Sequence, residues 1–343
     1  MSRKNNFSFV HMIGALMVVL GHQYVLMGYS APTILGMDIH GLGVRIIFVI
    51  SGFLVTESFM RSKNVREYLF KRMVRIYPLL VVFVFVSILA GALFTTCSFK
   101  DYFLFSKDYL FKNLLMSPKF DLPGVFSDNI YPVSVNGSLW TLPVELTCYI
   151  LVIFFMLLNK LLEKKSVRVA NGYYAFLCIL LGVIYILRIT GVLNSTLIFW
   201  GTDWANAIQV SAYFFMGSLF SKLNLKKYCN LQMAVVLCGL CMGIGGIFTR
   251  IMWIFVIPYA TLSFSLTDNP LFSNVIKNNI CYGVYIWSFP VQQALIQVLI
   301  IRNQMQCSPL LMFIASLIPT LLLAYISFFA VEKPISKYMA KNK

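Results

Sequence analysis

Charged residues are scarce in this 343-residue chain. Only 12% of the residues are Asp, Glu, Lys or Arg, whereas soluble globular proteins carry about 25%. Hydrophobic residues make up 59% of the sequence, and the mean hydropathy is +0.80. The composition therefore excludes an ordinary soluble domain. Repeated apolar runs long enough to cross lipid as helices predict an all-α, polytopic membrane protein.

Acidic residues are scarcer still, with 12 against 28 basic residues and a net charge of +16. In a soluble protein this excess would point to nucleic acid. Here the basic residues stand in short clusters between apolar spans, as they do where charge sets membrane topology. We therefore expect contact with membrane lipid and no nucleic-acid partner.

Familiar catalytic motifs are absent: the sequence has no GxSxG, HExxH or P-loop. Eight cysteines are scattered, and the CxxC at Cys238 and Cys241 lacks a second pair. They are interpreted as small packing residues. The sequence therefore predicts no metal site and no bound cofactor, and any chemistry must come from polar residues within the spans.

Ten segments are candidates for membrane-spanning helices within one domain covering residues 1–343. The segment near Ile251 is the weakest, because it contains Pro258. With the N-terminus inside, inner segments hold 20 basic residues and outer segments hold 7, which predicts that both termini are cytoplasmic. The segment from Ser98 to Gly137 becomes a long outer loop, of a length that is usually functional. The candidates begin near Phe7, Leu42, Tyr77, Leu139, Tyr173, Trp204, Leu231, Ile251, Cys281 and Pro309.

Two of the three histidines, His11 and His22, stand in the first apolar span. Eleven residues of α-helix end about 20° past three full turns, so both share one face, about 16 Å apart. Polar groups on one face of a membrane helix usually look into the bundle or a wet cavity. A buried histidine bonded to a backbone carbonyl is the alternative for each.

The second span contains Arg45 near its outer end, Glu57 near its inner end, and Ser51 followed by Gly52 in the middle. Small residues there allow close helix contact. Arg45 falls at the expected depth of His22, and Glu57 falls at that of His11. Arg45, Ser51 and Glu57 are therefore candidates to line a site. Snorkelling to the interface is the alternative for Arg45.

The segment "KRMVRIYP" precedes the third span. Arg72 and Arg75 are three residues apart, so they share a helical face and could bind phosphates bidentately. Tyr77 is a candidate lining residue in the same segment. Ordinary positive-inside charge with anionic lipid contact is the alternative for the arginines.

The fourth span opens with "NGSLWTLPVE". Pro143 suits a first helical turn, which places Glu145 in that turn at the outer end. A carboxylate at this depth could orient His22 and raise its basicity. It could also simply complement the helix dipole. Trp140 is a further candidate to line the site.

The ordered set "FVISGFLV", "KRMVRIYP", "NGSLWTLPVE", "YGVYIWSFP" and "VEKP" resembles the acyltransferase-3 family of bacterial integral-membrane acyltransferases, over nearly the whole chain. The stretch from Asp121 to Glu145 resembles the branch that modifies exopolysaccharide and O-antigen. The chain departs from the family at His11, where members have an arginine, and at Ser288, where many have a histidine.

The resemblance implies an O-acyltransferase of the bacterial inner membrane. The donor would be acyl-CoA, most simply acetyl-CoA, at the cytoplasmic face. The acceptor would be a hydroxyl of a cell-surface glycan or its lipid-linked precursor. His22 would act as general base or transient acyl carrier, with Glu145 orienting it. Arg72, Arg75 and His11 would serve the donor. A carrier or flippase for a polar lipid or small solute is the alternative, since intramembrane charges fit that too.

Overall fold

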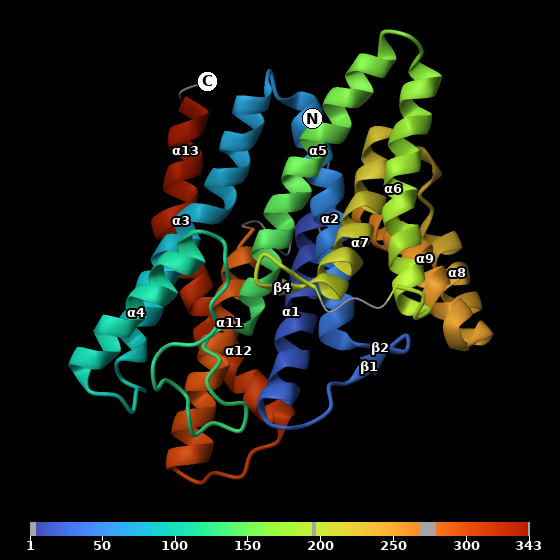
Figure 1. Cartoon of the computed structure of the whole chain (residues 1–343). Helices are drawn as coiled ribbons and strands as arrows, with labels where there is room; N and C mark the ends of the chain where they lie inside the picture. The colour runs from blue at the N-terminus through green and yellow to red at the C-terminus, as the bar shows by residue number, and fades with distance from the viewer. Residues whose placement is uncertain (1–4, 194–196, 268–278, 342–343) are drawn as a thin grey trace. The chain divides into compact units, whose positions relative to one another are not determined.

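The computed structural model describes residues 5–193, 197–267 and 279–341, and it is almost entirely helical (Figure 1). Two-residue strands form two small antiparallel hairpins, β1 (Thr33–Ile34) with β2 (Met37–Asp38) and β3 (Ile198–Phe199) with β4 (Thr202–Asp203). The α-helices are α1 (Phe7–Leu26), α2 (Ile39–Arg61), α3 (Val65–Gly91), α4 (Phe99–Leu114), α5 (Thr141–Glu163), α6 (Val167–Ile189), α7 (Trp204–Lys222), α8 (Leu231–Ile244), α9 (Gly246–Leu266), α11 (Cys281–Leu295), α12 (Pro309–Ser327) and α13 (Lys333–Lys341).

The predicted polytopic all-α fold is confirmed. Among the described residues, 8 helices are long and apolar enough to cross a membrane. They include α9, despite Pro258 within it. Two of the ten predicted spans do not meet this standard. The 19 residues of α7 are less apolar, and the 14 residues of α8 would reach only about 21 Å across a core about 30 Å thick.

The chain folds into two compact units that alternate along the sequence. The first comprises residues 1–14, 44–70 and 144–278, and the second comprises residues 15–43, 71–143 and 279–343. The division falls within α1, α2, α3 and α5, so each of these helices contributes residues to both units.

Backbone-to-backbone packing joins α2 to α7 in the first unit. A Cβ on Gly52 would lie 1.8 Å from the carbonyl oxygen of Phe214, and a Cβ on Gly217 would lie 2.1 Å from that of Val49. Only glycine allows this approach, which confirms the close helix contact predicted beside Ser51. In the same unit, α7 also packs against α6 and α9, and α8 packs against α9.

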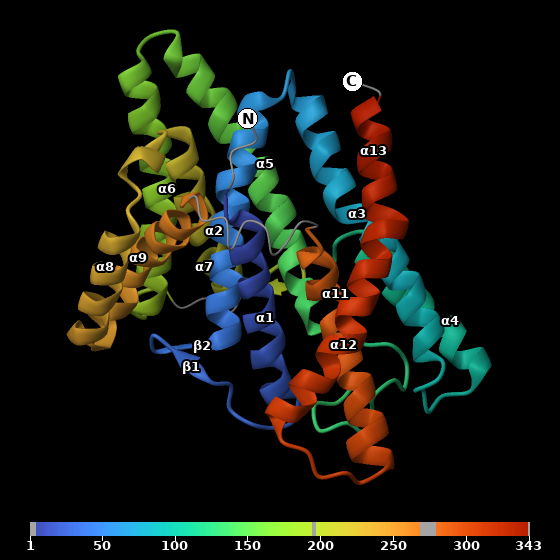
Figure 2. The same ribbon diagram turned by 180° about the vertical axis from the view of Figure 1, so that it is seen from behind.

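The second unit is built around α11, which packs along α12 (Figure 2). Gln292 of α11 is fully buried and donates to the carbonyl of Val19 in α1 at 2.8 Å. Two π-helical segments follow these helices: η3 (Ile296–Arg302) and η4 (Phe328–Glu332). Such segments are rare and often stand at functional sites.

Three local predictions are corrected. The third helix begins at Val65 rather than near Tyr77, because it continues through its basic segment. The long outer loop contains α4, a 16-residue helix capped by Ser98. Glu145 is the fifth residue of α5 and lies just past its first turn, because α5 begins at Thr141 after the short helix η1 (Gly137–Trp140).

Candidate active site

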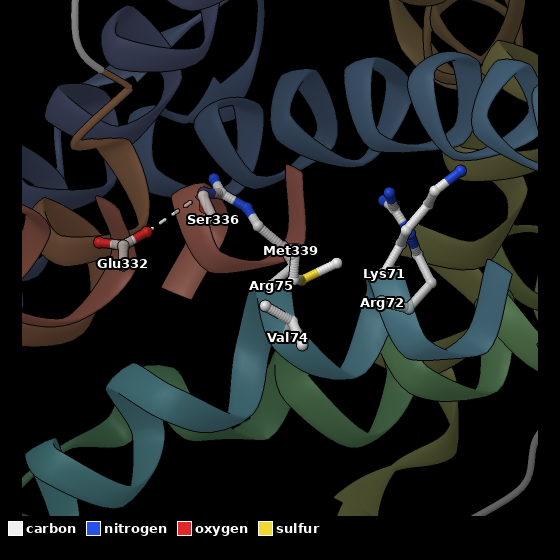
Figure 3. A pocket seen from close by; sticks show the side chains of 7 residues that line it. All are labelled: Lys71, Arg72, Val74, Arg75, Glu332, Ser336 and Met339. Carbon is white, nitrogen blue, oxygen red and sulfur yellow. Dashed lines mark hydrogen bonds and ion pairs between the residues drawn. The ribbon is translucent and has the colours of Figure 1, made fainter. Parts of the chain in front are cut away.

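A cationic pocket of about 330 Å³ stands between the N-terminal part of α3 and the C-terminal helix of the second unit. Lys71, Arg72 and Arg75 line it from α3, and Glu332, Ser336 and Met339 line it from η4 and α13 (Figure 3). Arg72 and Arg75 are about one turn apart on α3, and both line this pocket, while their predicted role in binding a donor stays a prediction. Three cations face one carboxylate, so the pocket favours an anion.

Arg75 is held by two partners within this pocket. Its Nη1 lies 3.2 Å from Oε2 of Glu332, whose side chain is only 8% exposed. Its guanidinium also stands 5.8 Å from the ring centre of Tyr282. Figure 3 shows Arg75 turned toward Glu332, with Lys71 and Arg72 together on the other side. Arg75 is therefore positioned by the fold, and Lys71 and Arg72 line the same pocket.

His22 is half-buried near the C-terminal end of α1. Its ring meets the edge of Phe289 at 5.4 Å and lies 5.7 Å from the ring of His40. Its Nδ1 is buried and has no hydrogen-bond partner among the described residues. The imidazole is thus flanked by the ring of Phe289 from α11 and by a second imidazole.

His40 is a candidate site residue that the sequence pattern did not indicate. It stands at the second position of α2, after the β1–β2 hairpin returns the chain toward α1. Gly21 makes the approach possible, because a Cβ there would lie 2.6 Å from Cβ of His40. The available signal was that His40 is the third histidine of three in the sequence.

Four other predicted residues lie in the first unit, each half-buried. Arg45 stands 5.7 Å from the ring centre of Tyr213. Glu57 pairs with Arg61 and, at 3.0 Å, with Nζ of Lys226, so a charge network occupies it. The remaining two, His11 in α1 and Ser51 in α2, share that unit, and their predicted part in a site stays a prediction.

Glu145 belongs to the first unit and accepts a hydrogen bond from the hydroxyl of Tyr149, one turn along α5. Its predicted pairing with His22, which belongs to the second unit, stays a prediction. Trp140 and Tyr77 belong to the second unit and are half-buried, Trp140 at the end of η1 and Tyr77 within α3. Their predicted contact with substrate also stays a prediction.

The apolar spans, the cationic pocket and the enclosed histidine define an integral-membrane protein equipped to handle an anionic ligand. The family model described as "Acyltransferase domain" matches residues 7–329. The chain belongs to this acyltransferase family, which makes it a membrane-bound acyltransferase and confirms the family predicted from the motifs.

Two curated relatives support this assignment. The chain is 29% identical to a protein named "O-acetyl transferase" from Shigella phage Sf6, across 97% of this chain and 96% of the relative. It is 32% identical to "Nodulation protein 10" of Rhizobium leguminosarum bv. viciae, across 43% of this chain and 42% of that protein. No solved structure gives a significant match.

Proposed function

We propose that this enzyme transfers an acyl group, in the first instance acetyl, from acyl-CoA to a hydroxyl of a cell-surface glycan or its lipid-linked precursor. The reaction takes place in the bacterial inner membrane, with the donor bound at the cytoplasmic face. The observation that carries the proposal is the pocket in which Lys71, Arg72 and Arg75 gather within one unit.

The pocket suits the phosphates of a CoA donor. Guanidinium groups bind phosphate oxygens bidentately, and a lysine adds a point charge. The positive-inside distribution favours a cytoplasmic position for this end of α3, where acyl-CoA is available. The half-exposed side chains of Lys71 and Arg72 give the donor a place to bind without breaking the Arg75–Glu332 pair.

His22 supplies the proposed chemistry at the acceptor. A ring nitrogen of His22 takes the proton of the acceptor hydroxyl while the oxygen attacks the thioester carbonyl carbon. The carbon–sulfur bond then breaks, and the CoA thiolate leaves and takes up the proton from the imidazolium. In the second route, His22 first carries the acyl group itself and then passes it to the hydroxyl. Both routes require a neutral imidazole at the start.

The glycan acceptor and the acetyl group rest on two supports. The full-length relative from a Shigella phage is named an O-acetyl transferase. The motifs from Asp121 to Glu145 resemble the branch that modifies surface polysaccharides. Membership in the acyltransferase family favours this function over that of a carrier or flippase without acyl chemistry.

The test is transfer from acetyl-CoA labelled in the acetyl group. Purified protein in lipid nanodiscs is incubated with donor and a polysaccharide extract, and products are separated chromatographically, because the protein's eight cysteines would interfere with thiol reagents. We expect release of free CoA and labelled acetate or labelled glycan. Absence of donor turnover, with transport of a labelled lipid or solute instead, would contradict the proposal.

A further inference from the structure

A second pocket, of about 390 Å³, lies in the outer segment that follows α4. Its volume is within the range of small-ligand sites, about 300–1,000 Å³. Phe120, Asp121 and the stretch from Tyr131 to Ser134 line it, together with Gly137. Unlike the cationic pocket beside α3, this pocket is lined by no Lys or Arg, so it does not favour phosphates.

The lining combines aromatic faces with a carboxylate. Aromatic rings pack against the apolar face of a flat ligand. The Asp121 carboxylate pairs with Nζ of Lys119 at 3.2 Å, which orients it, and its remaining lone pairs can accept hydrogen bonds from ligand hydroxyls. A neutral ring that carries several hydroxyls satisfies both features at once. A pyranose sugar has this chemistry, whereas an acyl chain would use the aromatic faces alone.

Hydrogen bonds hold the pocket in shape. The amide of Val135 donates to the carbonyl of Phe120 at 2.7 Å. The fully buried side chain of Gln293 donates at 2.8 Å to the carbonyls of Tyr131 and Ser134 and accepts from Asn129 at 2.8 Å. A loop tied to a helix in this way is preorganised, so binding costs little ordering entropy.

Backbone strain marks the same segment. Val133 has φ of +70° and Phe126 has φ of +56°, a conformation that is unusual for a β-branched residue such as valine. The amide of Val133 donates to the carbonyl of Phe126 at 3.2 Å, which ties the two strained positions together. Strain of this kind persists only where the surroundings impose it, and it is concentrated at functional sites.

Two contacts connect this pocket to His22. Gly137 lines the pocket, and a Cβ on it would lie 2.9 Å from Cε2 of Phe289. The Phe289 ring in turn meets His22 at 5.4 Å. Phe289 and Gln293 are one turn apart on α11, so one helix face supports both the loop and the histidine. Both views place this loop at the same end of the second unit as the C-terminal end of α1 (Figures 1 and 2).

From these observations we propose that the pocket between Phe120 and Gly137 binds a pyranose ring of the acceptor, beside the phenyl ring of Phe289 that packs against His22. This inference rests on the proposed function and names the acceptor subsite.

The test measures sugar binding directly, by saturation-transfer NMR with a panel of methyl pyranosides. The protein is held in nanodiscs, because most mild detergents carry sugar head groups. We expect Asp121→Asn to weaken binding about tenfold, the loss of one charge-assisted hydrogen bond, and Tyr131→Ala to weaken it about fivefold. Tyr29→Ala is the matched control, since Tyr29 is exposed in the same unit and does not line the pocket.

Further arms separate the outcomes. Binding of a methyl pyranoside is compared with binding of the same sugar linked to geranyl diphosphate, which distinguishes a free chain end from a lipid-linked acceptor. Binding of either ligand that is weakened by the pocket variants supports the site. Unchanged affinity in both pocket variants, or no binding of any pyranoside, would overturn it. CoA binding and acetyl-CoA turnover are measured on the same samples: their presence without sugar binding overturns only the subsite, and their absence overturns the proposed function.

Discussion

Replacing Arg72 with alanine should weaken CoA binding and leave the fold intact. Arg72 lines the cationic pocket, and a charge-assisted hydrogen bond to phosphate contributes about 1.5–3 kcal/mol. At about 1.4 kcal/mol per tenfold change, the dissociation constant should rise roughly 10-fold to 150-fold. Arg75→Ala is a less clean perturbation, because it leaves the buried Glu332 carboxylate without its 3.2 Å partner. That variant should lose both CoA affinity and thermal stability.

The assay is isothermal titration of CoA and of 3′-dephospho-CoA into protein in nanodiscs. Arg168→Ala is the matched control, because Arg168 is an exposed arginine near the start of α6 and does not line the pocket. If Arg72 contacts the 3′-phosphate, the binding free energy lost on Arg72→Ala and that lost on removing the phosphate should not be additive. CoA affinity unchanged in both Arg72→Ala and Arg75→Ala would show that neither side chain binds the donor.

Three further predictions concern the fold and the histidine pair. Tags at both termini and at Lys164 should report the cytoplasm, and a tag at Asp121 the outer compartment; termini on opposite faces would contradict the topology. Gly52→Ala should lower the melting temperature through overpacking of about 1–3 kcal/mol or more, since its Cβ would lie 1.8 Å from a carbonyl oxygen; Gly239→Ala, with nothing within 4 Å, is the control and should not lower it. His40→Ala should slow transfer, without weakening CoA binding, by less than the factor of about 10²–10⁴ expected for a general base; an unchanged rate would remove His40 from the site.

The helices were predictable because each rests on a local property, the length of an apolar run. The start of the third helix and the helix α4 were not predicted, because charged and apolar residues are interspersed in both segments. The third helix continues through the basic residues from Val65, which a hydropathy pattern does not favour. The helix α4 has low mean hydropathy, although Ser98 with Asp101 three residues later is a recognisable N-cap pattern.

The site was predictable only in its local parts. Arg72 and Arg75 share a pocket because they are one turn apart on α3, which the sequence determines. Glu332, the partner of Arg75, is 257 residues away along the chain, and no spacing rule predicts that pair. The His22–His40 contact likewise depends on how the loop between α1 and α2 folds, and on Gly21 leaving room for the ring.

The decisive measurement for the proposed mechanism is acetyl transfer by His22→Ala. The variant and the wild-type protein are compared at equal amounts in the membrane, with labelled acetyl-CoA and glycan acceptor, and His11→Ala runs beside them. Loss of a general base or acyl carrier should lower the rate of transfer by a factor of about 10²–10⁴ or more. CoA affinity should stay the same, and His11→Ala should keep part of its activity. Transfer by His22→Ala at the wild-type rate would contradict the mechanism.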